Sequence, residues 1–141
     1  MLRTTSQIID HYTRMEQKIE GDYTLLADMF PEYRNLFHKY SEETRKHRER
    51  VVRAYRFGVT DAYEVGFLSN PLEVDDFRLK DIEGDDLYES LDSLIKNEGR
   101  AVNFLEAAKE SSGDLIPDLH NNFQYVTKMK KRRIEQIEKI R

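Results

Sequence analysis

Residues 15–47, "MEQKIEGDYTLLADMFPEYRNLFHKYSEETRKH", contain two amphipathic patterns separated by a single proline. On both sides of Pro31, apolar side chains recur every three or four residues, the spacing that places them on one face of an α-helix. The residue before a proline avoids helical backbone angles, so the first helix should end at Phe30. Because so few residues join the two patterns, they predict an antiparallel helical hairpin.

The same spacing continues outward and predicts four helices. Their expected ranges are about 5–30, 32–57, 86–111 and 114–141. Gly58 is placed to cap the second helix, and "SSGD" at 111–114 puts Gly113 at a cap and Asp114 near the next helix start. Pro117 fits the first turn of the fourth helix, where its missing N–H would be unpaired in any case.

A long acidic connection, residues 58–85, should join the two hairpins. It contains several apolar residues, namely Tyr63, Val65, Phe67, Leu68, Leu72, Val74 and Phe77. A disordered linker would not need them, so we expect this crossover to lie along the bundle and cover part of its core. Two hairpins joined by one long crossover form the ferritin-like variant of the four-helix bundle. The predicted fold is therefore all-α and ferritin-like, with residues 1–141 as one domain.

Composition narrows the function classes. The chain has 141 residues and a net charge of −4. It contains no cysteine, so thiolate metal sites and cysteine nucleophiles are excluded. No stretch approaches the ~20 apolar residues of a membrane span, and the N-terminus lacks the apolar block of a signal peptide, so we expect a cytoplasmic protein.

The acidity of the chain is concentrated in its middle, where residues 58–92 hold 11 acidic and 2 basic residues. This acidity argues against nucleic acid as the partner. The basic segment "KMKKRR" at 128–133 could attract the acidic crossover of this chain or that of a second subunit, and the second case would favour a homodimer.

Each apolar stripe is interrupted near its centre by polar residues. They are Glu16 in the first helix, Thr44 and His47 in the second, Glu98 in the third, and Lys130 and Arg133 in the fourth. The centres of antiparallel helices lie at one height, so these side chains should meet in a single layer. An uncompensated buried charge costs several kcal/mol, so such a layer must be paired, metal-bound or close to solvent.

Residues 5–57 and 86–141 resemble rubrerythrin-like members of the ferritin-like superfamily. In that family a ligand glutamate of the first helix precedes a tyrosine by seven residues, as Glu16 precedes Tyr23. A glutamate of the third helix precedes a small residue and an aromatic one, as in "IKNEGRAVNFLEAAKES" (95–111), which contains Glu98. A Glu-x-x-His pattern of the second helix ends here at His47. The resemblance implies a di-iron site built from glutamates of two helices and Glu-x-x-His pairs of the other two.

The chain departs from this ligand pattern at several positions. Thr44 stands three residues before His47, with Glu43 one residue earlier, and Lys130 and Arg133 fall where the resemblance places a glutamate and a histidine. Two cations should repel Fe²⁺ or Mn²⁺. They would balance Glu16 and Glu98 without metal, because arginine binds a carboxylate through two hydrogen bonds. The leading hypothesis is therefore a bundle without a cofactor, in which an ion-pair network replaces the di-iron site. It would bind an unidentified protein partner or serve a structural role.

Two alternatives remain open, and with them whether the protein is an enzyme. The first is a non-haem iron or manganese oxidoreductase acting on peroxide or ferrous iron, with Glu16, Glu43, His47 and Glu98 as its ligands. The second is a helical interaction protein unrelated to ferritins, which would not explain the shared height of the polar residues. Within these hypotheses His47 is a metal ligand, a general base, or a core histidine bonded to Glu16 or Glu98.

Overall fold

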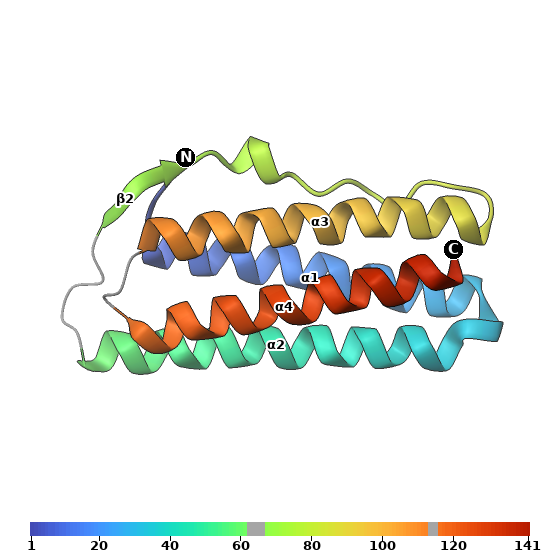
Figure 1. Cartoon of the computed structure of the whole chain (residues 1–141), viewed down its shortest axis with the longest axis horizontal. Coiled ribbons are helices and arrows are strands. Elements are labelled where there is room, and N and C mark those ends of the chain that lie inside the picture. The colour runs from blue at the N-terminus through green and yellow to red at the C-terminus, as the bar shows by residue number, and fades with distance from the viewer. Residues whose placement is uncertain (62–66, 113–115) are drawn as a thin grey trace.

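The computed structural model describes residues 1–61, 67–112 and 116–141, and it is mostly helical. Four long helices lie side by side along one axis: α1 (Thr5–Met29), α2 (Arg34–Asp61), α3 (Leu87–Ser112) and α4 (Pro117–Ile140) (Figure 1). The helices α1 and α2 run in opposite directions, as do α3 and α4. The predicted helical bundle is thus present, together with a small sheet that the sequence did not indicate.

Local signals set the ends of α1. Thr4 caps the helix, because its hydroxyl accepts a hydrogen bond from the Gln7 amide and the Gln7 side chain accepts one from the Thr4 amide. The helix ends at Met29, one residue before the predicted end. Residues Pro31–Tyr33 then form a short 3₁₀ turn that leads directly into α2.

The small sheet joins the N-terminus to the start of the crossover. Strand β1 (Leu2–Thr4) pairs antiparallel with β2 (Phe67–Leu72), and Leu2 lies opposite Leu72. A strand of three residues is too short to show an alternating pattern, and its partner lies more than 60 positions away in the sequence. Periodicity therefore gives no signal for this pairing.

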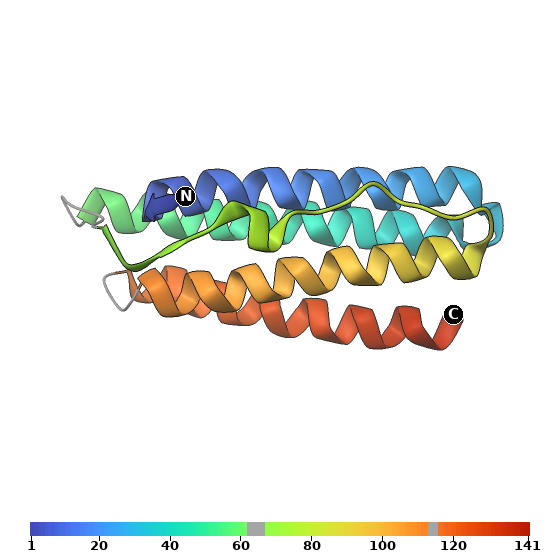
Figure 2. The same ribbon diagram turned by 90° about the horizontal axis from the view of Figure 1, so that it is seen from above.

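Residues 67–86, the described segment that leads from the crossover into α3, are named the strap here. After β2 and a 3₁₀ turn (Val74–Phe77), it runs extended between α1 and α3, along the length of the bundle (Figure 2). Leu68 and Leu72 are buried, and further apolar side chains of the strap pack on the core. The buried Asn97 side chain holds the strap backbone at Lys80, donating to its carbonyl at 2.6 Å and accepting from its amide at 3.0 Å.

Two predicted helix ends were wrong. Gly58 does not cap α2, which continues to Asp61. Instead this glycine allows a close approach to the turn before α4, since a Cβ at Gly58 would lie 2.3 Å from Ile116 Cγ2. Helix α4 begins at Pro117, three residues later than predicted, with the proline in its first turn as expected.

Some predictions lie outside the described residues, namely those on Tyr63, Val65, Gly113 and Asp114. Within the described ranges, the buried core is built from the predicted apolar lines of all four helices. Among the described helices, none combines the length and the apolar character that crossing a membrane requires.

Candidate functional site

Four charged side chains are buried together in the middle of the bundle. They are Glu16 of α1, Glu98 of α3, and Lys130 and Arg133 of α4, each with 2% or less of its surface exposed. Their positions follow from the helical periodicity that also buries their apolar neighbours, because each occupies an inward-facing position of its stripe. We call these four side chains the ion-pair layer.

The Lys130 ammonium lies between the two carboxylates. Its Nζ is 2.7 Å from Glu98 Oε1, to which it donates a hydrogen bond, and 2.6 Å from Glu16 Oε1. The contact with Glu16 is a close ion pair. One cation therefore joins carboxylates from two helices.

Arg133 extends the layer to α2. Its Nη1 donates to Glu98 Oε2 at 3.0 Å and to Thr44 Oγ1 at 2.9 Å, and its Nη2 donates to the half-buried Glu43 at 3.4 Å. The Thr44 hydroxyl in turn donates to the Tyr40 carbonyl. Thr44 thus provides a neutral acceptor at the position where the resemblance places a ligand glutamate.

Two buried tyrosines donate further hydrogen bonds to the carboxylates. Tyr23 donates to Glu98 Oε2 at 2.8 Å, and Tyr12 donates to Glu16 Oε2 at 3.2 Å. The Arg133 guanidinium also lies 5.4 Å from the Tyr23 ring centre and 5.3 Å from that of Tyr40, within cation–π range. Glu98 therefore accepts three hydrogen bonds, from Lys130, Arg133 and Tyr23, whereas Glu16 accepts one.

The two carboxylates differ in acidity. Burial by itself disfavours the charged form, but Lys130 and Arg133 together lower the pKa of Glu98 to about 2. For Glu16, burial outweighs the attraction of Lys130 and raises the pKa above its ordinary value. Burial opposes the charge of Arg133, yet the neighbouring Glu98 raises the pKa of that guanidinium further. Glu98 is thus the fixed negative charge around which both cations are arranged.

His47 is buried beside this layer but does not join it. Only 8% of the residue is exposed, and its Nδ1 has no hydrogen-bond partner. The ring packs edge-on against Tyr125, which also stacks with Arg50. Burial, followed by the charges of Arg133 and Lys130, lowers the pKa of His47 to about 4. The hydrogen bond to Glu16 or Glu98 suggested by the sequence does not form between these described residues.

The residues present do not fit a di-metal centre. Between Glu16 and Glu98, the space that a bridging metal ion needs is taken by the Lys130 ammonium. Glu43 faces Arg133 rather than His47. In the described ranges, no three histidine, aspartate or glutamate side chains converge in a way that could hold a metal ion. The arrangement neutralises the buried charges and cross-links all four helices.

Two residues that support the layer and the strap could not be recognised from the sequence. Gln136 accepts a hydrogen bond from the Tyr40 hydroxyl at the edge of the layer, and Asn97 beside Glu98 fixes the strap. A glutamine or asparagine at a helical position is usually solvated, so only its tertiary neighbours identify such a role.

Comparisons of the chain with protein-family models, with curated proteins and with solved structures find no match.

Proposed function

We propose that this chain is a ferritin-like bundle protein of the rubrerythrin kind whose di-iron site has been replaced by the ion-pair layer. It acts as a binding or structural module rather than as an oxidase. The observation that carries this proposal is the Lys130 ammonium, which sits 2.6 and 2.7 Å from carboxylates of two different helices. Held between two glutamates, this ammonium neutralises their charge, as a metal ion would at that position.

The chain path supports the ferritin-like part of the proposal. Two antiparallel hairpins are joined by a strap that runs along the length of the bundle, so α2 and α3 point in the same direction (Figure 1). Ferritin-like four-helix bundles have one long connection between two hairpins, so this chain path supports that part of the proposal.

The charge balance supports the absence of a metal. Two buried carboxylates face two buried cations, and Glu43 adds a partly exposed carboxylate next to Arg133. Burying a divalent ion beside Lys130 and Arg133 would add a repulsion of like charges in a low-dielectric interior, which is strongly unfavourable.

The test is metal retention. The purified protein is exposed anaerobically to Fe²⁺, desalted, and assayed for iron by elemental analysis, alongside a variant carrying Thr44→Glu, Lys130→Glu and Arg133→His. We expect no retained iron in the parent and retained iron in the variant. The matched control carries Lys131→Glu and Arg132→His on the exposed surface of α4, and it should behave like the parent.

One result would overturn the proposal. Near-stoichiometric iron in the parent that is lost in His47→Ala would mean that His47 and the glutamates recruit metal despite the two cations. Circular dichroism on every variant tests whether the bundle is folded. If the triple variant is unstable, the iron content of the parent still decides the question.

A further inference from the structure

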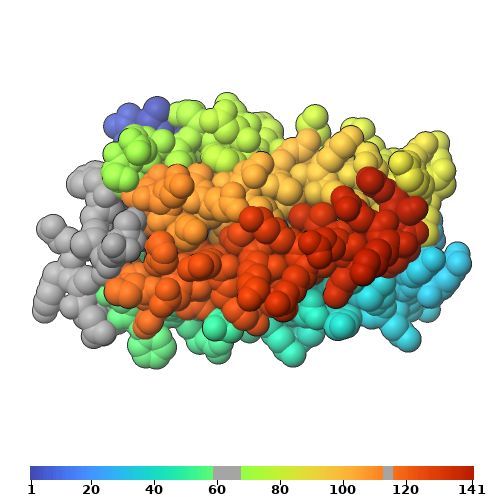
Figure 3. Space-filling model, viewed as in Figure 1, coloured from blue at the N-terminus to red at the C-terminus, as the bar shows by residue number. Residues whose placement is uncertain are grey.

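Charge is divided strongly between two opposite sides of the bundle. Helix α2 carries eight lysine and arginine residues and four acidic ones, whereas the strap carries seven acidic residues and two basic ones. The strap lies on one side of the bundle and α2 on the other (Figure 1), and seen from above the strap crosses over α2 (Figure 2). In the space-filling view the strap and α2 lie at opposite edges of the molecule (Figure 3).

The outward surface of α2 has an excess of positive charge, and we call it the basic face. Its exposed cations are Lys39, Lys46, Arg50, Arg53 and Arg56. The two exposed glutamates of this helix, Glu42 and Glu49, are already paired with Arg45. Lys46 and Arg53 form no ion pair with another described residue. Lys39 contacts Glu43 of the same helix at 3.9 Å, so the positive charge that this helix leaves without an ion pair includes that of Lys46 and Arg53.

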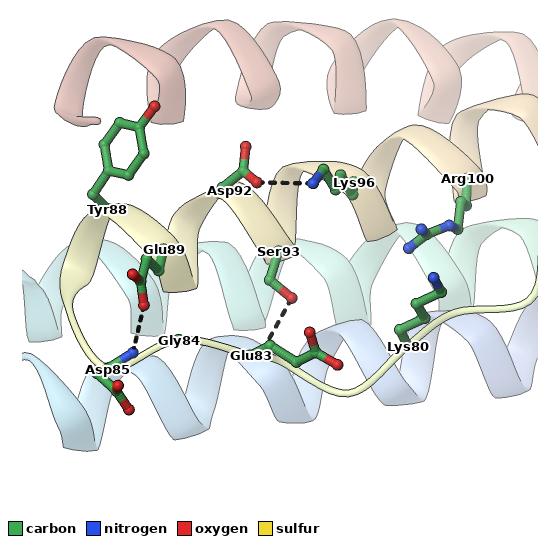
Figure 4. A pocket seen from close by; sticks show the side chains of 10 residues that line it. All are labelled: Lys80, Glu83, Gly84, Asp85, Tyr88, Glu89, Asp92, Ser93, Lys96 and Arg100. Atoms are coloured by element: carbon green, nitrogen blue, oxygen red, sulfur yellow. Dashed lines mark hydrogen bonds and ion pairs between the residues drawn. The ribbon is translucent and has the colours of Figure 1, made fainter.

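The strap is the complementary surface. Asp76, Glu83 and Asp85 are exposed, and their carboxylates form no ion pair with another described residue. Beside them, a groove of about 650 Å³ separates the strap from α3. Glu83, Asp85, Glu89 and Tyr88 line it, and Figure 4 shows the Glu89 side chain bonded to the Asp85 amide. Lys80, Lys96 and Arg100 line the other end of the groove, so the acidic end is well defined.

We propose that the basic face of α2 binds the acidic strap of a second copy of this chain, with basic side chains entering the acidic end of the groove. This inference rests on the proposed function, because it identifies the partner of the binding module. Both surfaces run along the long axis of the bundle, so one can lie along the other over several helical turns. The two surfaces lie on opposite sides, so they cannot meet within one chain.

A second copy fits better than a nucleic acid. It brings, in equal amount, an acidic surface that also runs along the bundle, whereas a nucleic acid would be repelled by the strap and by the net charge of −4. Because the contact joins two different surfaces, the assembly is head-to-tail and grows with concentration. It depends on exposed charges, so salt weakens it.

The experiment is sedimentation velocity over a range of concentrations. Measurements are made at an ionic strength of about 0.01 M, where the screening length is about 30 Å, and at about 0.15 M, where it is about 8 Å. We expect the parent to associate at low salt, with an apparent Kd about tenfold weaker at the higher salt. A parent that stays monomeric at every concentration at low salt overturns the proposal.

Charge reversal identifies the surfaces. Lys46→Glu with Arg53→Glu should abolish association, and so should Asp76→Lys with Glu83→Lys and Asp85→Lys. An equimolar mixture of these two variants should associate again, because each then carries the surface that the other needs. Lys128→Glu with Arg132→Glu, on the exposed surface of α4, changes the net charge as much as the first variant but alters neither the basic face nor the strap, and it should associate like the parent.

Two further results would contradict the proposal. The first is association of the parent that neither reversal weakens. The second is a parent that binds a single-stranded DNA 20-mer through Lys46 and Arg53 while its self-association is absent. Metal retention is measured separately, so iron in the parent would refute the proposed function without affecting this test.

Discussion

Lys130 of α4 and Glu98 of α3 form an ion pair of 2.7 Å with both side chains wholly buried. Such a pair has lost its hydration, so its stability depends on the neighbours that complete it. In this structure the completing neighbours are Glu16, Arg133 and Tyr23. Removing one member should therefore cost more than the pair contributes by itself.

We expect Lys130→Met to lower the free energy of unfolding by about 3–5 kcal/mol, because it leaves Glu16 and Glu98 buried without their shared cation. Chemical denaturation measures this change. The control is Lys131→Met, which removes the exposed pair with Glu106 and should cost less than about 1 kcal/mol. Equal losses in the two variants would show that the buried pair has no special role.

The Glu98 carboxylate should make the protein sensitive to acid. Its folded-state pKa of about 2 lies below the ordinary value of 4.5. Its stabilising contribution is therefore complete above pH 4.5 and is lost as the pH falls to about 2, by about 3 kcal/mol at 1.36 kcal/mol per unit. Glu16 acts in the opposite direction, because its raised pKa makes protonation favour the folded state.

The contributions of the two carboxylates are separated by measuring the unfolding free energy of the parent and of Glu98→Gln between pH 2 and 4.5. The variant should show a weaker loss of stability with falling pH in that range. The exposed Glu106→Gln serves as the control and should keep the parent's dependence. A Glu98→Gln profile parallel to the parent's would mean that another group is responsible.

His47 should titrate far below an ordinary histidine. Its folded-state pKa of about 4 lies below 6.5, so the unfolded chain takes up a proton first as the pH falls, and stability is lost between pH 6.5 and 4. NMR titration of its ring protons should give a midpoint near 4. His47→Gln should flatten the pH dependence of stability in this window, while His38→Gln, at an exposed position, should not. A midpoint near 6.5 would mean that His47 is solvated.

Gly58 should resist replacement by alanine even though it lies inside a helix. Alanine normally stabilises a helix interior by about 1 kcal/mol relative to glycine. At Gly58, however, the new Cβ would lie 2.3 Å from Ile116, which we expect to cost about 1–3 kcal/mol. Thermal unfolding compares Gly58→Ala with Gly99→Ala of α3, where a new Cβ would meet no atom beyond the neighbouring helix backbone within 4 Å and stabilisation is expected. A Gly58→Ala variant as stable as Gly99→Ala would contradict this packing.

The fold could be predicted from sequence wherever the signal was local. The spacing from Ile8 to Leu26 and Pro31 indicated α1 and its end, and Thr4 with Gln7 sets its start by contacts within one turn. The wrong helix end at Gly58 shows the limit of such signals. A glycine after a helical pattern usually marks a cap, but here its role is the contact with Ile116, almost sixty residues away.

The sequence by itself determined which residues are buried and polar, because helical periodicity assigns each side chain to a face. It therefore indicated that Glu16, Thr44, Glu98, Lys130 and Arg133 would lie on inward faces. Only the tertiary structure decided the pairing. Lys130 reaches two glutamates, Arg133 connects Glu98 to Thr44 and Glu43, and His47 remains apart beside Tyr125. The physical reason is that periodicity fixes a direction around one helix axis, whereas a hydrogen bond or ion pair depends on distances between helices.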